Sequence, residues 1–245
     1  MSLKTTDEKC YLCGELLSQP INRDHVPPRR FFAREIRQKN NLAELITLPT
    51  HKVCNARWQM DEEYFVHTFL PFARGSTSGD ALYRDGIARI QQGSNVPLAN
   101  AVLKEFQQHV NGVILPANRV AKKFDAQRVH DVIYKIIRGL HYHHEGEILP
   151  AVASCHFTVT PPGEQPPDFF VTLAKEGLIE PEGYYRGVFA YARRKFSEAN
   201  NLHFWAMLFW DTLIITAAFH DPTCECGDCS FIGPPQLLRG DRRSH

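Results

Sequence analysis

Hydrophobic residues recur at helical spacing in several stretches of the chain. The clearest stretch is 126–144, where apolar residues fall three and four positions apart and so share one face of a helix. Those residues are Val129, Val132, Ile133, Ile136, Ile137 and Leu140. Helices are also expected over 60–72, which begins with acidic residues and has Pro71 near its end, and over 100–110. We expect the 126–144 helix to pack its apolar face on a core.

Later segments change from helical to strand-like composition. Residues 155–160, 184–193 and 204–219 are rich in β-branched and aromatic side chains, and Pro, Gly and Asn turns separate them. The last of these is interrupted by Asp211, which favours a buried pair of strands over a membrane span. The second half of the chain is therefore expected to contain a sheet.

Turn-forming residues and short apolar segments suggest how the chain is divided. RGSTSGD at 74–80 and PPGEQPPD at 161–168 are loops by composition. Residues 1–60 have no long periodic helix and too few apolar residues to form a stable core alone, so a structural metal is expected there. We predict an α+β protein with a small N-terminal domain over 1–73 and a larger mixed α/β domain over 74–245.

Composition excludes several classes of protein. Hydrophobic residues make up 43% of the 245-residue chain and charged residues 22%, as in an ordinary globular protein rather than a disordered or fibrous one. No apolar run is long enough for a membrane span, and the first ten residues lack the apolar core of a signal peptide. We therefore expect a cytoplasmic protein with no membrane partner.

Charge is distributed unevenly along the chain. The net charge is only +1, but residues 1–60 hold ten Lys and Arg against six Asp and Glu, which leaves the rest of the chain at −3. Many of these basic residues lie between 23 and 39. Such a stretch is either a solvated face or, beside a metal site, a surface that binds phosphate.

The seven cysteines are clustered, which favours metal binding over disulfides in a chain without a secretory signal. Cys10-x-x-Cys13 and His51-x-x-Cys54 have the spacing of two zinc knuckles, because an x-x spacing lets both side chains of a tight turn point at one ion. The alternative is that these are four unconnected polar side chains. Cys155 stands alone.

Between the two pairs, Asp24-His25-Val26-Pro27 places a carboxylate and an imidazole where a strand would end, and Asn55 directly follows the second pair. The ordered combination over 10–57 resembles the HNH endonuclease motif in its zinc-stapled ββα-metal form. The resemblance implies a metal-dependent endonuclease that hydrolyses phosphodiester bonds, most simply in DNA, and it covers about a quarter of the chain.

Residue by residue, the resemblance implies His25 as general base and Asp24 and Asn55 as ligands of a catalytic Mg²⁺ or Mn²⁺. A neutral imidazole suits proton abstraction near neutral pH, and a hard cation prefers oxygen ligands. The resemblance also implies a structural Zn²⁺ at the two pairs. The nucleic-acid contacts expected near this site are Arg23, Arg29, Arg30 and Arg57.

Two positions depart from the family pattern. The last ligand is Asn rather than His, so that Glu62 or Glu63 would complete the site, unless these carboxylates only interact with a helix dipole. The middle Asn of the motif, which would orient His25, is expected near 44–47, where no Asn occurs. Asn40 and Asn41 would serve only if the loop is re-routed.

Other functions stay open at this level. A zinc-knuckle module that binds nucleic acid without cutting it is the main alternative, and a structural or regulatory partner protein is another. The larger domain would recognise a target, sense a small molecule or form an oligomer such as a homodimer. Three C-terminal cysteines, Cys224, Cys226 and Cys229, would form a second zinc site with His220 or remain reduced thiols.

Overall fold

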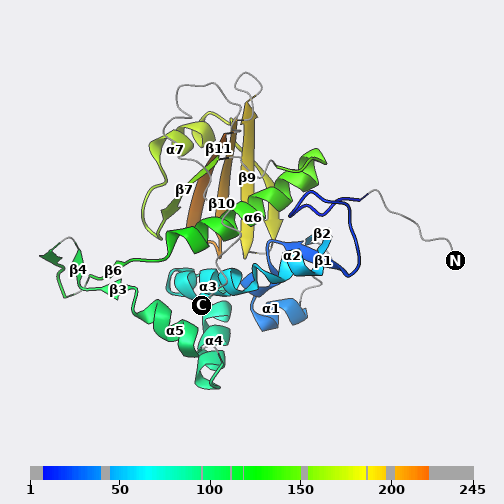
Figure 1. Cartoon of the computed structure of the whole chain (residues 1–245). Helices are drawn as coiled ribbons and strands as arrows, with labels where there is room; N and C mark the ends of the chain where they lie inside the picture. The colour runs from blue at the N-terminus through cyan, green and yellow to red at the C-terminus, as the bar shows by residue number, and fades with distance from the viewer. Residues whose placement is uncertain are drawn as a thin grey trace.

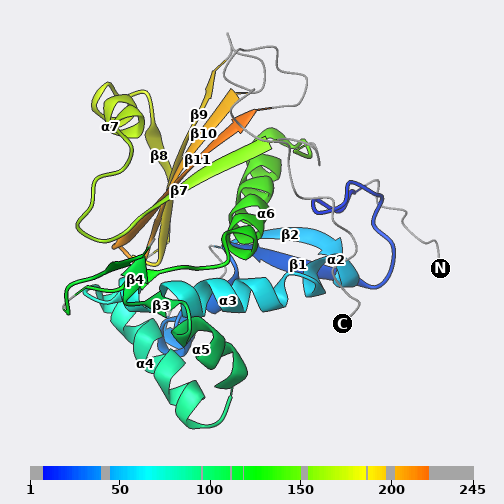
Figure 2. The same cartoon turned by 60° about the vertical axis from the view of Figure 1, so that its left-hand side comes forward.

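The structure is a computed structural model that describes residues 8–39, 45–94, 96–110, 112–117, 119–149, 154–185, 187–196 and 202–220. A five-stranded antiparallel sheet forms one layer, and the long helix α6 (Ala126–Glu145) crosses one of its faces (Figure 1). Turning the molecule shows α6 between this sheet and the N-terminal elements (Figure 2). Helices and antiparallel sheets both occur, so the predicted α+β class is confirmed.

The N-terminal elements form a hairpin followed by a short helix. Strands β1 (Ile21–Val26) and β2 (Ile46–His51) pair antiparallel, with His25 opposite Thr47. A 3-10 helix (Arg29–Phe31) and helix α1 (Arg34–Lys39) lie between them in the chain. Helix α2 (Lys52–Ala56) begins directly after β2. The order strand, strand, helix is the one that the resemblance implies for residues 10–57.

Helices α3 (Gln59–Phe69) and α4 (Thr77–Gln91) follow, joined by a 3-10 helix (Leu70–Ala73). The first confirms the helix expected over 60–72. The loop expected over 74–80 is wrong in its second half, because α4 begins there. The Ser76 side chain caps α4 by accepting a hydrogen bond from the backbone N–H of Gly79 at 3.0 Å. A Cβ at Gly79 would lie 1.6 Å from the Ala73 carbonyl oxygen, so the turn requires glycine.

The helix expected over 100–110 is confirmed only over 100–103 and is wrong beyond them. Helix α5 (Val96–Leu103) ends early, and the chain then forms short strands. These are β3 (Phe106–Gln107), β4 (His109–Val110), β5 (Val113–Ile114) and β6 (Ala121–Lys122). Strands β4 and β5 pair across a tight turn in which Gly112 adopts a φ of 82°. Glycine favours such a turn, and this preference determines the local structure because the helical pattern here rests on only a few apolar residues.

Helix α6 has both of its ends defined by local hydrogen bonding. Asp125 caps it by accepting from the backbone N–H groups of Gln127 and Arg128, and Gly146 ends it in the left-handed conformation, at a φ of 70°. This confirms the helix predicted over 126–144. His143 and His144 lie in its last turn, where imidazoles interact favourably with the helix dipole.

The large sheet has the strand order β7-β11-β10-β9-β8. Its strands are β7 (Ser154–Thr160), β8 (Glu180–Tyr185), β9 (Phe189–Phe196), β10 (Leu202–Phe209) and β11 (Leu213–His220). The loop expected over 161–168 precedes helix α7 (Asp168–Lys175). The strand pair predicted over 204–219 is confirmed as β10 and β11.

The turn between β10 and β11 connects the sheet to the N-terminal elements. Trp210 and Asp211 both have positive φ, which is uncommon outside glycine and strained for a bulky side chain such as that of Trp210. Trp210 is fully buried and its indole N–H donates to the Phe31 carbonyl oxygen at 2.9 Å, and these contacts offset the backbone strain. A single hydrophobic core contains residues of both predicted domains, 1–73 and 74–245.

In the part of the chain that the structure describes, no helix has the length and apolar character needed to cross a membrane.

Candidate metal centre and active site

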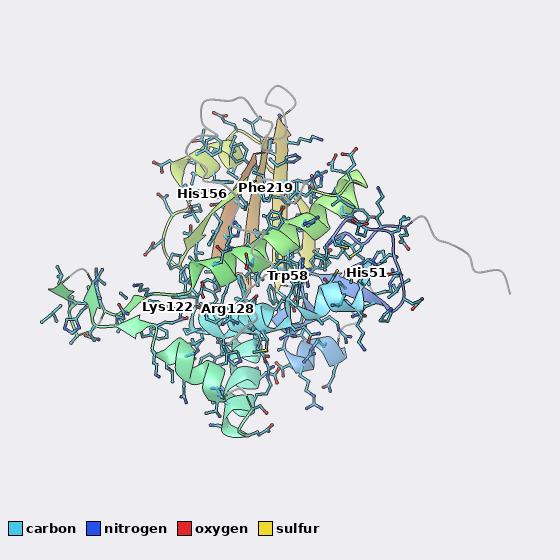
Figure 3. All side chains as sticks on the ribbon, viewed as in Figure 1. His51, Trp58, Lys122, Arg128, His156 and Phe219 are labelled. Atoms are coloured by element: carbon cyan, nitrogen blue, oxygen red, sulfur yellow. The ribbon has the colours of Figure 1, made fainter. Side chains whose placement is uncertain are left out.

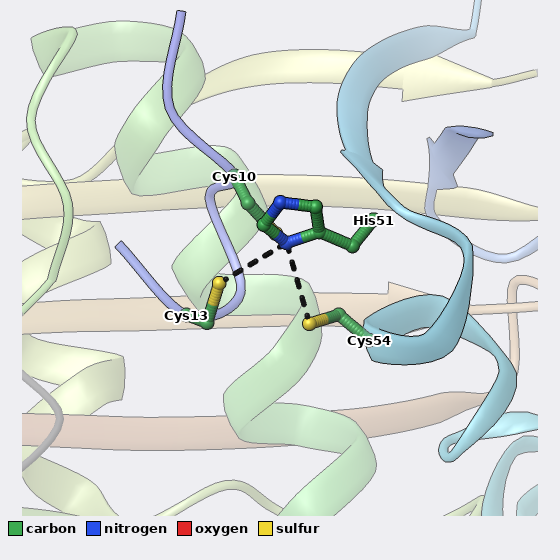
Figure 4. A group of neighbouring side chains, drawn as sticks. All are labelled: Cys10, Cys13, His51 and Cys54. Atoms are coloured by element: carbon green, nitrogen blue, oxygen red, sulfur yellow. Dashed lines mark hydrogen bonds between the residues drawn. The ribbon is translucent and has the colours of Figure 1, made fainter. Parts of the chain in front are cut away.

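Two pairs of metal-ligating side chains meet at one end of the hairpin. Cys10 and Cys13 lie in the turn before β1, His51 ends β2, and Cys54 lies in α2 (Figure 4). The ligand atoms of these residues all lie within 4.8 Å of one another. We call this group the ligand cluster. The structure thus brings together all four residues of the predicted knuckles, and the cluster can hold a metal ion.

The first knuckle is shaped by its backbone. The Gly14 N–H donates to the Cys10 carbonyl oxygen at 2.8 Å, and Gly14 adopts a φ of 85°. The Cys10 N–H donates to the Glu15 carbonyl oxygen at 2.9 Å, so the chain reverses tightly after Cys13. This turn directs the Cys10 and Cys13 side chains toward the end of β2.

The His51 ring shows which of its nitrogens would bind the metal. Its Nδ1 lies 3.4 Å from the Cys13 sulfur and 3.7 Å from the Cys54 sulfur (Figure 4). Its Nε2 lies 3.1 Å from the Leu16 carbonyl oxygen and 3.1 Å from the Ser18 backbone nitrogen. When Nδ1 is the ligand, the ring proton is on Nε2 and donates to Leu16, an outer hydrogen bond of the kind that fixes metal-bound imidazoles.

Two thiols of the ligand cluster, those of Cys10 and Cys54, have opposed pKa shifts. Burial tends to raise the pKa of Cys10, but hydrogen bonds from the Thr50 hydroxyl and nearby backbone N–H groups outweigh it and lower the pKa to about 6. Burial and the neighbouring Cys10 raise the pKa of Cys54 to about 12. The thiolates therefore repel one another, and a divalent cation between them removes that repulsion. Three thiolates and one imidazole fit a closed, structural zinc site.

A second group of polar side chains meets deeper in the molecule. The Lys135 ammonium on α6 lies 2.7 Å from Asp24 Oδ2 on β1, 2.5 Å from Glu62 Oε1 on α3 and 3.3 Å from Asn55 Oδ1 on α2. Lys135 is 2% exposed, Asp24 6% and Glu62 5%. We call these four residues the Lys135 centre. The predicted pair Asp24 and Asn55 is thus brought together, around an ammonium group.

Further hydrogen bonds and an ion pair occupy the carboxylate oxygens of this centre. The Tyr11 hydroxyl donates to Asp24 Oδ2 at 2.5 Å, and the His25 backbone N–H donates to Asp24 Oδ1 at 2.9 Å. Arg30 Nε lies 3.1 Å from Glu62 Oε2. Burial raises the pKa of Glu62, and Lys135 acts to lower it. A divalent cation between Asp24 and Asn55 does not fit this arrangement, because Lys135 holds that position.

His25 follows Asp24 on β1 and is partly buried. Burial lowers the pKa of His25, and the charge of Arg29 lowers it further, so the imidazole is neutral at pH 7. Thr47 is its partner across the hairpin, and the Thr47 hydroxyl donates to the Leu45 carbonyl oxygen rather than to His25. Asn40 and Asn41 lie outside the described residues, so the re-routed loop stays a prediction.

The basic residues predicted to contact nucleic acid differ in their surroundings. Arg23, Arg29 and Arg57 are exposed. Arg57 lies over the Trp58 ring, 5.0 Å from its centroid. Arg30 is directed inward to Glu62 and also lies 3.5 Å from Glu63. Three of the four predicted arginines are therefore accessible to a phosphate backbone, and Arg30 takes part in the fold.

The sequence interpretation missed Lys135 and Tyr11. Lys135 falls outside the apolar face of its helix, where a lysine is normally solvent-exposed, so nothing in the sequence indicated that α6 is buried on a second side. The sequence offers Glu62 as an alternative ligand at this site, and in the structure it belongs to the Lys135 centre. Cys224, Cys226 and Cys229 lie outside the described residues, so a second zinc site stays a prediction.

Comparison of the chain with protein-family models, with curated proteins and with solved structures found no match in any of the three.

Proposed function

We propose that this chain hydrolyses phosphodiester bonds in DNA through its N-terminal HNH-like unit, with His25 as general base. One observation carries the proposal. Asp24 and Asn55, the two residues that the motif places around a reaction centre, approach the same atom, Lys135 Nζ, next to a complete set of four metal ligands. Unrelated polar residues in a chance sequence match would have no reason to converge in this way.

The ligand cluster would bind Zn²⁺ as a structural ion. Zinc would tie the turn before β1 to the end of β2 and the start of α2, which keeps Asp24 and Asn55 in register. Because no ligand position is left open among three cysteines and a histidine, the zinc is not expected to activate water itself. The ion proposed here is therefore a folding element, and the chemistry belongs to the residues beside it.

His25 supplies the proton acceptor. Its lowered pKa keeps Nδ1 or Nε2 available to take a proton from a water molecule that attacks phosphorus, while one P–O ester bond breaks and the leaving sugar oxygen takes a proton from solvent. The guanidinium groups of Arg23 and Arg29 lie near it in the chain and would balance the charge that develops on the phosphate oxygens. Cleavage should consequently fall as the pH decreases through a value below 6.5, as His25 becomes protonated.

The test is plasmid cleavage by the zinc-loaded protein beside the variant His25→Ala. His109→Ala, a change of the exposed histidine in β4, is the matched control. We expect nicked or linear DNA from the wild type and the control and none from His25→Ala, with zinc content equal in all three. Cleavage that survives in His25→Ala would refute the role of His25, and its absence in the zinc-loaded wild type would refute the nuclease proposal.

The second candidate is a module that binds nucleic acid without cutting it. The observation that favours it is the engagement of Asp24, Asn55 and Glu62 with Lys135, which leaves these oxygens no role toward a substrate. Exposed arginines and a zinc-stabilised hairpin suffice for binding. Salt-dependent DNA binding without cleavage, weakened in Arg23→Ala and Arg57→Ala, would support this candidate over the first.

A further inference from the structure

The Lys135 ammonium has as many N–H donors as it has acceptors around it. An ammonium carries three donors, and Asp24, Glu62 and Asn55 supply an oxygen each, at 2.7, 2.5 and 3.3 Å. The three acceptors come from β1, α3 and α2, so Lys135 joins three elements of the N-terminal part to α6. No donor of Lys135 remains for a phosphate. The group is a fixed part of the interior and not a substrate contact.

The buried charges of this region balance without an added ion. Asp24 and Glu62 contribute two negative charges, and Lys135 and Arg30 contribute two positive charges, while the more exposed Glu63 lies 3.5 Å from Arg30 at the edge of the region. A divalent cation placed among them would leave an excess of positive charge in a buried site, which is strongly unfavourable. The same cation would also need oxygen lone pairs that now accept hydrogen bonds.

We infer that Lys135 occupies the position between Asp24 and Asn55 in place of a divalent cation and excludes such an ion from it. The HNH resemblance implies Mg²⁺ or Mn²⁺ at this position, so the chain departs from that pattern through a residue of its second half. The inference concerns what the Lys135 centre binds, and it holds whether or not the protein cleaves DNA.

Helix packing explains why Lys135 is held there. Gly139, one turn further along α6, has no side chain, and a Cβ at this position would lie 2.6 Å from Val26 Cγ2. The close approach of α6 to β1 brings the Lys135 side chain to Asp24. Tyr11 and Tyr142 pack with ring centroids 6.4 Å apart on the same side of the helix. The close packing of α6 on the hairpin therefore explains why Lys135 reaches Asp24.

The test measures Mn²⁺ binding to the zinc-loaded protein by electron paramagnetic resonance. The wild type should bind no Mn²⁺ at up to about 1 mM, a range in which an open site with two carboxylates binds hard cations. Lys135→Ala removes the ammonium and leaves Asp24, Asn55 and Glu62 facing the vacated space. This variant should take up one Mn²⁺ per chain at about 0.1 mM or below, at least tenfold under the limit tested for the wild type, and the added change Asp24→Asn should abolish that uptake.

Lys122→Ala is the matched control, because Lys122 is another largely buried lysine that lies 2.7 Å from a carboxylate, Glu105. It lies far from His51 and the hairpin (Figure 3), and its removal should create no such site. Mn²⁺ binding by the wild type that Asp24→Asn removes would overturn the inference. So would a folded Lys135→Ala protein that binds no Mn²⁺.

A second measurement decides the question if Lys135→Ala does not fold. The wild type is treated with acetic anhydride with and without Mn²⁺, and the acetylation of each lysine is followed by mass spectrometry. Mn²⁺ is used at about 5 mM, above the usual dissociation constants of exposed protein sites for such ions. Lys135 should stay protected in both conditions, while exposed Lys52 reacts. Acetylation of Lys135 that appears only with Mn²⁺ would show displacement by the ion and overturn the inference.

Discussion

The ligand cluster and the Lys135 centre lie at the same hairpin, but they balance their charge in opposite ways. The ligand cluster gathers three thiols and an imidazole, and no cationic side chain of the described residues lies at its middle, so it can hold an ion from solution. The Lys135 centre gathers two carboxylates and an amide around a cation that belongs to the chain. Two adjacent residues of α2 belong to different centres, because Cys54 is part of the ligand cluster and Asn55 is part of the Lys135 centre. Spacing in the sequence therefore does not by itself tell which site needs a metal.

Removing a thiol from the ligand cluster should have the largest effect on the molecule. Cys54→Ser should lose zinc and unfold the N-terminal part, because metal binding and folding are coupled in small zinc units, where apparent binding free energies reach about 10 kcal/mol or more. Zinc content and thermal unfolding measure this. Cys155→Ser, at a described cysteine outside the cluster, is the control and should keep its zinc. Equal zinc content in Cys54→Ser and the wild type would contradict the assignment of the site.

Removing the cation of the Lys135 centre should come next. Lys135→Met leaves Asp24 and Glu62 buried without their partner, and breaking a buried ion pair in this way costs about 3–5 kcal/mol of unfolding free energy. Urea unfolding of zinc-loaded protein measures the loss. Glu35→Gln, which removes an exposed partner of Arg84, should change stability by less than about 1 kcal/mol. A Lys135→Met protein as stable as the wild type would mean that the centre contributes nothing to the fold.

Low pH should destabilise the protein through a residue of the large sheet rather than through either centre. Burial and the neighbouring His141 lower the pKa of His203 to about 4. The unfolded chain therefore binds a proton at His203 that the folded chain does not between about pH 6.5 and 4, so unfolding is favoured as the pH falls through this range. From pH 7 to pH 5 the wild type should lose about 2 kcal/mol through His203 alone.

Urea unfolding of the wild type and of His203→Phe at the two pH values measures this loss, with zinc content followed throughout. The variant should lose less stability between pH 7 and pH 5 than the wild type does. An identical loss in both proteins, with zinc retained, would place the acid-sensitive group elsewhere, for example in the hairpin.

A single methyl group on α6 should have the smallest effect. Gly139→Ala places a Cβ 2.6 Å from Val26 Cγ2 and 3.3 Å from Tyr11, which overpacks the contact between α6 and the hairpin and costs about 1–3 kcal/mol. Ser94→Ala, at an exposed residue, serves as the control. Gly163→Ala would be unsuitable, because Gly163 has positive φ and its substitution adds backbone strain. The expected loss appears as a lower midpoint of urea unfolding. An unchanged midpoint would mean that α6 can shift away from the hairpin without cost.

The two centres also differ in how far the sequence predicted them. The ligand cluster follows from local spacing, because Cys10-x-x-Cys13 and His51-x-x-Cys54 each form within one turn of backbone. Asp24 and Asn55 were predicted to converge on a metal, and they do converge. The atom between them comes from Lys135, far along the chain, and only the packing of α6 against both the sheet and the hairpin reveals it.

The fold shows the same division between local and distant causes. The period of α6 and the β-branched and aromatic composition of β10 and β11 predicted these elements correctly, because each signal extends over many residues. The hairpin at β4 and β5 and the start of α4 were missed, because a glycine turn and a serine cap decide them over a few residues. The positive φ of Trp210 depends on contacts with Phe31, which no local pattern contains.

The two kinds of centre can be distinguished in one crystal. Crystals of the full chain grown with Zn²⁺ and soaked in Mn²⁺ would be measured at the absorption edges of both metals. We predict one zinc peak among Cys10, Cys13, His51 and Cys54, and no manganese peak between Asp24 and Asn55, where the Lys135 ammonium should lie. A manganese peak at that position, with the Lys135 side chain displaced, would contradict the conclusion that this centre carries its own cation.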